Sequence, residues 1–238
     1  MTWLESFVDF AHGRLGDSVR ESLWARGASD SQIRLYRVGH VEGQLPDLDY
    51  PKDFLKWCWE GRRLPDNFVL PLTNSIGQVK GLQFRSADPD KKGYSDYIPV
   101  ADEPLTFGLS QAMQSSWDAG YILLTEGVFD VFPVQRFFPN SIPALTNKLS
   151  GPMARLLQRL VTDVYFVFDM DESGRKAAKR ALYSYKDSRL RLHDLCLSRP
   201  KTLDGTRRVK DPGELWETWG DDRFGQHIRE LVMEDRNA

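Results

Sequence analysis

Two apolar runs that end in acidic residues constrain the fold of this chain more than any other feature. The first run, Tyr121–Thr125, is followed by Glu126. The second run, Val164–Phe168, is followed by Asp169 and Asp171. Each run has the length of a buried strand and precedes a helical pattern, which predicts βαβ units and a largely parallel sheet. Functional groups of open α/β sheets gather beyond the carboxyl ends of the strands. We therefore expect these acids to meet at one edge of the sheet.

The residues before these runs follow a different pattern. Helical spacing of apolar residues covers 2–24, and shorter helices are expected at 32–38 and 51–61. From residue 67 two strands around a turn at 73–77 predict a β-hairpin. The expected fold is α/β, or α+β for the whole chain. Its parts are a small mixed helical and β-hairpin subdomain over 1–118, a domain with a mainly parallel central sheet flanked by helices over 119–220, and a C-terminal helix and tail over 221–238.

Composition excludes several protein classes. The 238 residues are 41% hydrophobic and 28% charged, which suits one large domain or a core with a smaller lobe. No apolar run approaches the roughly 20 residues of a membrane span, and the N-terminus lacks the basic region of a signal peptide. Cys58 and Cys196 lie far apart, which excludes a cysteine-based zinc ribbon in this chain and suits a reducing cytosol. We expect a cytoplasmic protein without a membrane partner.

The charge is unevenly distributed along the chain. The net charge is −2, but residues 148–210 contain 15 Lys and Arg against 7 Asp and Glu. A basic half beside an acidic half is compatible with a groove that follows phosphates. A solvated helix face at 175–191 accounts for about half of that excess, so charge alone does not decide the function.

The paired aspartates point to metal chemistry. On an extended segment Asp169 and Asp171 face the same way, and their repulsion is tolerable when a divalent cation lies between them. Oxygen ligands with no His or Cys nearby favour Mg²⁺ or Mn²⁺ over zinc. The alternative is that both acids only begin a helix, whose dipole favours negative charge at that end.

Two further acids are candidates for the same place. Asp130 lies about one helical turn after Glu126, so it could point to the same site or cap the turn. Asp211 precedes Pro212, which disfavours a helical conformation at Asp211 and holds that acid in an extended loop. Two cations about 4 Å apart stabilise the entering and leaving oxygens of a phosphoryl displacement, the chemistry of polymerases, nucleases and topoisomerases.

Three segments resemble the signature blocks of the Toprim domain, in the version carried by DnaG-type bacterial and phage primases. They are LLTEGVFDVF, VYFVFDMDESGRKAAKRAL and VKDPGELW. Three upstream segments resemble the helix, the hairpin and the second helix that precede this domain in those primases. They are RGASDSQIRLYRVG, FVLPLTNSIGQVKGLQFRS and LTFGLSQA. The resemblance covers roughly residues 16–218, and it implies the catalytic core of such a primase.

The resemblance also implies roles for the acids. Glu126 matches a metal-bridging or general-base glutamate, and Asp169 and Asp171 match a metal-binding pair. These three are the implied catalytic residues. Asp130 matches the second acid of the first block and Asp211 the first acid of the last block, so all five are implied ligands of Mg²⁺ or Mn²⁺.

Nucleotide and template contacts are less fully matched. Arg85 matches an arginine of a basic ridge that guides the template or binds nucleotide phosphates in the family. A second late aspartate of the family falls on Gly213, with Glu214 beside it as a possible substitute. A family lysine is missing near Tyr97, where Lys91 or Lys92 could compensate. The residues expected to bind nucleic acid or nucleotide are Arg85, Lys92, Lys148, Arg175 and Lys210.

The implied enzyme is a nucleotidyltransferase that synthesises short RNA primers on DNA by two-metal chemistry. Its implied partners are single-stranded DNA, ribonucleoside triphosphates and a replicative helicase or other replisome protein supplied in trans. Zinc-binding and helicase-binding domains of family primases do not fit within 238 residues, which suits a phage or mobile element. Two alternatives remain open. One is another Toprim enzyme such as a nuclease, and the other is a catalytically degenerate replication accessory or binding protein.

Overall fold

The computed structural model describes residues 2–43, 45–60, 66–88, 94–99, 103–145 and 149–237. The chain forms two compact units, and each is described by itself. The first unit comprises Met1–Trp24 and Ser29–Gly108, and the second comprises Ala25–Ala28 and Leu109–Ala238. The subdomain boundaries expected at 118 and 220 stay predictions. No helix within the described ranges is long and apolar enough to cross a membrane.

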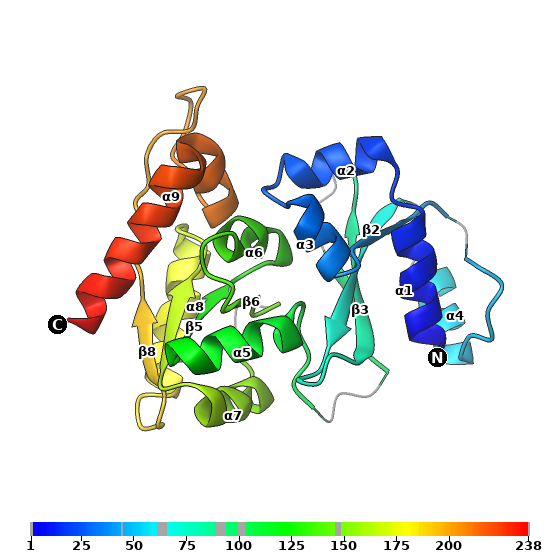
Figure 1. Ribbon diagram of the computed structural model, residues 1–238, viewed down its shortest axis with the longest axis horizontal. Coiled ribbons are helices and arrows are strands. Elements are labelled where there is room, and N and C mark those ends of the chain that lie inside the picture. The colour runs from blue at the N-terminus through cyan, green and yellow to red at the C-terminus, as the bar shows by residue number, and fades with distance from the viewer. Residues whose placement is uncertain are drawn as a thin grey trace. The chain divides into compact units, whose positions relative to one another are not determined.

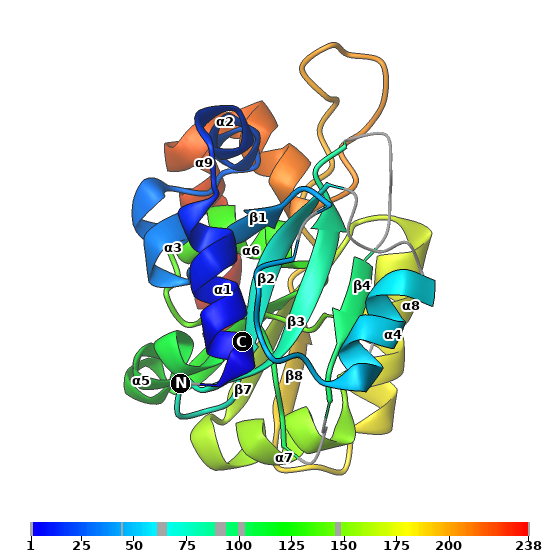
Figure 2. The same cartoon turned by 90° about the vertical axis from the view of Figure 1, so that its right-hand side faces the viewer.

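The first unit packs helices against an antiparallel sheet (Figures 1 and 2). The sheet has the order β1-β2-β3-β4. Phe7, Phe54 and Phe84 are buried together in its core. The strands are β1 (Gly39–Val41), β2 (Asn67–Thr73), β3 (Val79–Ser86) and β4 (Tyr94–Tyr97), and the helices are α1 (Trp3–Gly13), α2 (Asp17–Trp24), α3 (Asp30–Leu35) and α4 (Lys52–Glu60).

The predicted hairpin is present as β2 and β3. Its turn is held by Asn74, whose Oδ1 accepts hydrogen bonds from the backbone N–H groups of Ile76 and Gln78. Gly77 adopts a φ of 84°, a conformation that favours glycine. Two expectations for this unit were wrong. The helix expected over 2–24 is two helices separated by residues 14–16. The segment between the helices expected at 32–38 and 51–61 was predicted without a strand, but it contains β1, whose three residues are too few to show an alternating pattern.

The second unit contains the parallel sheet that the sequence predicts. Its strand order is β6-β5-β7-β8, and all three strand pairs are parallel. The mixed α/β fold class is therefore confirmed. The strands are β5 (Tyr121–Thr125), β6 (Ser141–Pro143), β7 (Asp163–Val167) and β8 (Arg191–Asp194), and the helices are α5 (Leu109–Ala119), α6 (Val128–Gln135), α7 (Gly151–Leu160), α8 (Glu172–Ser184) and α9 (Pro212–Arg236).

Helices cover both faces of this sheet. Apolar residues of α5, α7 and α8 pack on one face with Leu124 and Phe166. Residues of α6 and α9 pack on the other face with Leu123 and Tyr165. Neighbouring residues of one strand thus point to opposite layers, which explains why residues 122–124 of β5 and 164–167 of β7 are all apolar. The result is a three-layered unit whose sheet is buried on both sides.

The last helix differs from the prediction. The C-terminal helix and tail were expected over 221–238, but α9 already begins at Pro212 and runs to Arg236. Gly220 interrupts it with a φ of 72° and a ψ of 177°, so the element is two helical segments joined by a kink. The first segment begins at Asp211, whose side chain caps it. Before the kink only Pro212 and Leu215 are buried, too few positions to form a helical repeat of apolar residues.

Candidate functional site

The acids follow two central strands of the parallel sheet. Glu126 comes directly after β5, and Asp169 comes two residues after β7. The two strands pair in parallel with Thr125 opposite Val167, so both acids leave the sheet at the same edge. The chain continues from β5 to β6 on one side, while β7 lies on the other side of β5. The acids therefore lie at the topological switch point, where open α/β sheets bind their ligands.

Asp169 carries the largest electrostatic perturbation in this group. Burial, and after it the negative charges of Asp130, Glu126 and Asp211, together raise the pKa of Asp169 to about 9. Burial and the charge of Asp171 also raise the pKa of Glu126, against a backbone hydrogen bond from Asp169. Five carboxyl groups thus interact within one region of the unit. Such a cluster is stabilised by positive charge placed among its members.

Asp130 interacts with the charge of Asp211 and with the backbone N–H of Gly213. Burial and the charge of Asp211 raise the pKa of Asp130 to about 7, while backbone N–H groups of Gly213 and Gly127 oppose that shift. A Cβ at Gly213 would lie 3.4 Å from Asp211 Oδ1 and 3.5 Å from Asp130 Oδ1. The glycine that replaces the expected second late acid therefore faces two other acids of the cluster.

Two of the acids also begin helices. Asp171 is the N-cap of α8 and accepts a hydrogen bond from the Gly174 N–H at 2.9 Å. Asp211 is the N-cap of α9 and accepts one from the Glu214 N–H at 2.8 Å. Of the aspartate pair that was considered as a helix start, Asp171 is a cap, and like Asp211 it lies at a positive helix end where a carboxylate is stabilised. Capping a helix does not prevent these two carboxylates from also taking part in the acid cluster.

The donor chemistry of the cluster fits a hard divalent cation. Glu126 Oε2 and Asp169 Oδ1 are buried and have no hydrogen-bond partner within the described structure. Buried carboxylate oxygens without a partner are costly, and an Mg²⁺ or Mn²⁺ ion would satisfy them. In the described part of the chain, no three His, Cys, Asp or Glu side chains are already arranged to hold a metal ion. The metal roles stay predictions.

Lys210 and Glu214 order the loop that carries Asp211. The Met170 N–H donates to the Lys210 carbonyl at 2.6 Å, which ties this loop to the Asp169–Asp171 segment. Arg207 donates to both carboxylate oxygens of Glu214, at 2.6 and 2.7 Å. The Lys210 N–H also donates to Glu214. Both carboxylate oxygens of Glu214 are therefore occupied by hydrogen bonds within this loop. This favours a role in positioning the loop over a role as substitute for the acid expected at Gly213.

The structure places two of the predicted basic residues near the cluster. Lys210 Nζ lies 3.4 Å from Asp211 Oδ2. Arg175 Nε donates to the carbonyl of Met170, between the paired aspartates, at 3.1 Å. Arg85 belongs to β3 of the first unit. Lys92 and Lys148 lie outside the described residues. The nucleic-acid and nucleotide roles of all five stay predictions.

A cavity of about 310 Å³ adjoins the paired aspartates. Its lining includes Asp169, Arg175 and Lys179, together with Asp194 and Cys196 from the end of β8. Arg175 and Lys179 lie one turn apart on α8, so they present two positive charges on one side of this cavity. An anionic group beside Asp169 would meet these two side chains.

Gly174 is a site residue that the sequence analysis did not single out. A Cβ at this position would lie 2.0 Å from the carbonyl oxygen of Asp169. Only a residue without a side chain permits that approach. The sequence did contain a signal for this role. Gly174 follows Asp171 by three residues, and a glycine inside the first turn of a helix is otherwise unfavourable.

Comparisons with known proteins agree with this geometry. A family model described as Toprim-like matches residues 123–207. A DNA primase of Neisseria meningitidis is 35% identical over 186 residues, which are 71% of this chain and 32% of the relative. A crystal structure of the zinc binding and RNA polymerase domains of Aquifex aeolicus primase has a TM-score of 0.74 at 22% identity, covering 97% of this chain and 59% of that one.

A further solved structure contains a ligand. The DnaG primase catalytic domain bound to single-stranded DNA has a TM-score of 0.74 at 20% identity, covering 95% of this chain and 79% of that one. At these identities the solved structures show a shared fold. The chain spans about a third of the length of the Neisseria relative.

Proposed function

Since this chain is related to the catalytic core of DnaG-type DNA primases, we propose that it is a DnaG-like primase core that joins ribonucleotides into short RNA primers on single-stranded DNA. The observation that carries the proposal is the meeting of Glu126 and Asp169 at the switch point of the parallel sheet. A related primase sequence and a shared primase fold support the same assignment.

In the proposed mechanism the acids hold the divalent ions. Glu126, Asp169 and Asp171 would be the principal ligands, and Asp130 and Asp211 would complete the negative field around them. Mg²⁺ or Mn²⁺, when bound, stabilises charge on the oxygens of the transferred phosphoryl group. Asp171 and Asp211 are oriented by the helix ends that they cap. Their fixed positions reduce the reorganisation needed when the ion binds.

The basic residues would bind the substrates. Arg175 is held against the Met170 carbonyl, which places its guanidinium beside Asp169 for contact with a nucleotide triphosphate. Lys210 would contribute a second positive charge from the neighbouring loop. Arg85, Lys92 and Lys148 are proposed to contact the template or nucleotide on the strength of the family resemblance.

The proposed partners follow from the same relationship. A single-stranded DNA template is supported by the DNA-bound structure of a related fold. Ribonucleoside triphosphates and a replicative helicase or other replisome protein are proposed from the expected reaction. A cytoplasmic location and a phage or mobile-element origin stay predictions from the sequence.

A primer-synthesis assay tests the proposal. The chain is incubated with single-stranded DNA templates, labelled ribonucleotides and Mg²⁺ or Mn²⁺, with and without the replisome proteins of its host. The proposal expects short RNA products that depend on template and metal. Absence of products under every combination would overturn it. A plasmid-nicking assay run in parallel distinguishes a nuclease of the same fold.

A second candidate function is a binding protein with a degenerate site. Gly213 favours it, because this glycine stands where the family resemblance expects an acid and faces Asp130 and Asp211. Calorimetric titration with Mn²⁺ separates the two candidates. A catalytic site binds the ion in a manner that depends on Asp169, and a degenerate site shows no such binding.

A further inference from the structure

A second concave site lies in the same unit and shares no lining residue with the acid cluster. It has a volume of about 640 Å³, within the range of ligand sites. One wall is the segment 198–200, which follows β8, and the other is the part of α9 after the kink at Gly220 together with Trp219 before it. We call this site the α9 groove. Its lining residues are Ser198, Arg199, Pro200, Trp219, Arg223, Gln226, His227 and Glu230.

The α9 groove is lined by two arginines without acidic partners. Arg199 donates from Nε to the Val209 carbonyl at 3.2 Å, and the Arg223 guanidinium lies over the Trp219 ring at 4.2 Å from its centroid. Within the described ranges neither forms an ion pair. Glu230 is the one acid of the lining, and it accepts a hydrogen bond from Gln226 at 2.7 Å. The groove therefore carries a net positive charge.

Aromatic rings hold Arg223 and the wall of the groove in place. Trp219 packs against the core beneath α9, and one face of the Arg223 guanidinium lies on its ring. The His227 ring packs edge-on against the Trp219 ring, with 5.1 Å between the two ring centroids. The Nε2 of His227 accepts a hydrogen bond from the Ser198 N–H, and burial lowers its pKa, which is consistent with a neutral ring. The wall at 198–200 is thus attached to α9 independently of any ligand.

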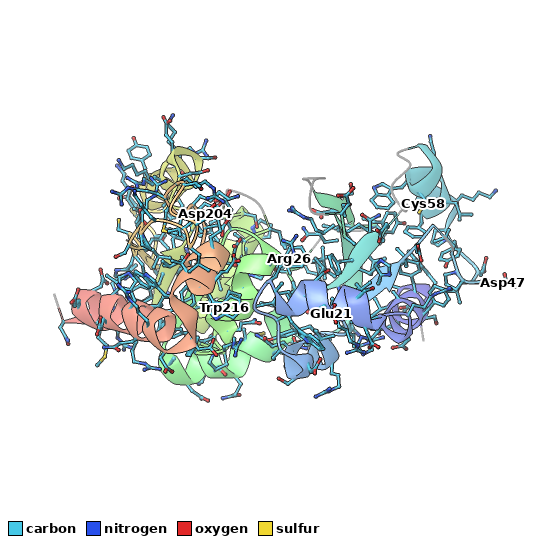
Figure 3. All side chains as sticks on the ribbon, turned by 90° about the horizontal axis from the view of Figure 1, so that it is seen from above. Glu21, Arg26, Asp47, Cys58, Asp204 and Trp216 are labelled. Atoms are coloured by element: carbon cyan, nitrogen blue, oxygen red, sulfur yellow. The ribbon has the colours of Figure 1, made fainter. Side chains whose placement is uncertain are left out.

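The loop beyond this wall extends the positive surface. It connects β8 to α9 and projects away from the parallel sheet (the orange loop of Figures 1 and 2). At its tip Asp204, which Figure 3 labels, accepts hydrogen bonds from Thr202 and Thr206, and these bonds close the turn. Lys201 and Arg208 face each other in a β-bridge at the base of the loop. Arg208 donates to the Arg199 carbonyl at 2.7 Å, which joins the loop to the groove.

We infer that the α9 groove binds a short stretch of single-stranded nucleic acid. Arg199 and Arg223 would contact successive phosphates, and a base would stack on the face of the Arg223 guanidinium opposite Trp219. Bases stack on arginine planes and aromatic rings without sequence preference, and a positive groove follows the backbone. An acidic peptide would also meet the charges but would leave the flat Arg223–Trp219 pair unused. The choice of nucleic acid as the occupant rests on the proposed function.

The test measures binding of a fluorescent oligothymidylate to the whole chain by anisotropy, in EDTA so that metal-dependent binding at the acids is removed. Arg223→Ala should weaken binding about 10-fold, the loss typical of one stacked base. Arg199→Ala should reduce the slope of log affinity against log salt by about 0.7, the effect of one phosphate contact. Glu230→Gln should tighten binding, a change of sign that unfolding cannot produce.

The matched control is Arg229→Ala, which removes the same charge from an exposed position of α9 outside the groove. It should leave the affinity unchanged. Arg223→Lys keeps the charge without the planar stack and should fall between wild type and Arg223→Ala. Equal effects of Arg223→Ala and Arg229→Ala would overturn the inference. Arg223-dependent binding of polyglutamate in place of the oligonucleotide would overturn it as well.

The inference and the proposed function fail in different ways. If wild type makes no primers while oligonucleotide binding still depends on Arg223, the primase assignment fails and the groove stands. If primers are made and the substitutions of Arg199, Arg223 and Glu230 leave oligonucleotide binding unchanged, only the inference about the α9 groove fails.

Discussion

Gly174 lies so close to the backbone of Asp169 that a Cβ on the glycine would fall 2.0 Å from the aspartate carbonyl oxygen. The Gly174 N–H donates to Asp171 at the same point. One glycine at the start of α8 thus contacts both members of the aspartate pair through its backbone. The position of the pair relative to the helix depends on the absence of a side chain there.

Substitution of this glycine should therefore be costly. Gly174→Ala forces the first turn of α8 away from Asp169, and we expect a loss of about 1–3 kcal/mol in the free energy of unfolding, as for other overpacked sites. Urea denaturation measures it. Gly151→Ala is the control, since its Cβ would meet only the flexible end of Arg155 at 3.5 Å. Equal destabilisation by both variants would contradict the close approach.

Divalent metal should stabilise the protein through the acid cluster. A ligand that binds only the folded state at 100 times its Kd adds about 2.7 kcal/mol to the unfolding free energy. We expect Mn²⁺ to raise the Tm of wild type in this way and to have little effect on Asp169→Asn. Differential scanning fluorimetry with increasing Mn²⁺ measures both. A Tm that rises equally in the two proteins would place the ion elsewhere.

The two acids at the start of α9 should differ in their response to metal. Asp211 interacts electrostatically with Asp130 and Asp169, whereas Glu214 is paired with Arg207 and with the Lys210 N–H. Asp211→Asn should weaken Mn²⁺ binding about 10- to 100-fold, and Glu214→Gln should weaken it less. Isothermal titration calorimetry gives both affinities. The reverse order would make Glu214 the ligand that replaces the acid missing at Gly213.

Acid stability should depend on Asp163 at the start of β7. Burial raises the pKa of this carboxyl, but hydrogen bonds from Arg191, Thr162 and His193 outweigh burial and lower the pKa to about 2. Because the folded pKa is below the ordinary 3.8, the contribution is present above pH 3.8 and is lost as the pH falls to about 2.

The contribution of Asp163 is about 2 kcal/mol, since the buried side chain is poorly screened. Asp163→Asn should lose that stability at neutral pH and flatten the fall in stability between pH 3.8 and about 2. Chemical denaturation at a series of pH values measures the curve. If the free energy of unfolding of Asp163→Asn fell with decreasing pH as steeply as that of wild type, other carboxyl groups would be responsible for the loss of stability in acid.

Much of the second unit could be predicted because its signals are local. The centres of β5 and β7 are apolar because the sheet is covered on both faces, and an acid that follows such a run leaves the sheet at the carboxyl end of the strand. The meeting of Glu126 and Asp169 followed from the parallel topology alone. The caps at Asp171 and Asp211 are likewise set by nearest neighbours.

The features that escaped prediction depend on contacts between distant segments. β1 is three residues long and is a strand because it pairs with β2. The pairing of Glu214 with Arg207 depends on how the loop before α9 folds back. The approach of Gly174 to Asp169 depends on how α8 packs. No periodicity or propensity within a short window contains these contacts.

The most direct test of the central claim is primer synthesis by wild type beside Asp169→Asn, with Asp187→Asn as a matched change at an exposed acid of the same unit. Each protein is given single-stranded DNA, labelled ribonucleotides, Mn²⁺ and the host replisome proteins. The account predicts short RNA products from wild type and Asp187→Asn, and none from a folded Asp169→Asn. Products from Asp169→Asn at the wild-type rate would contradict it.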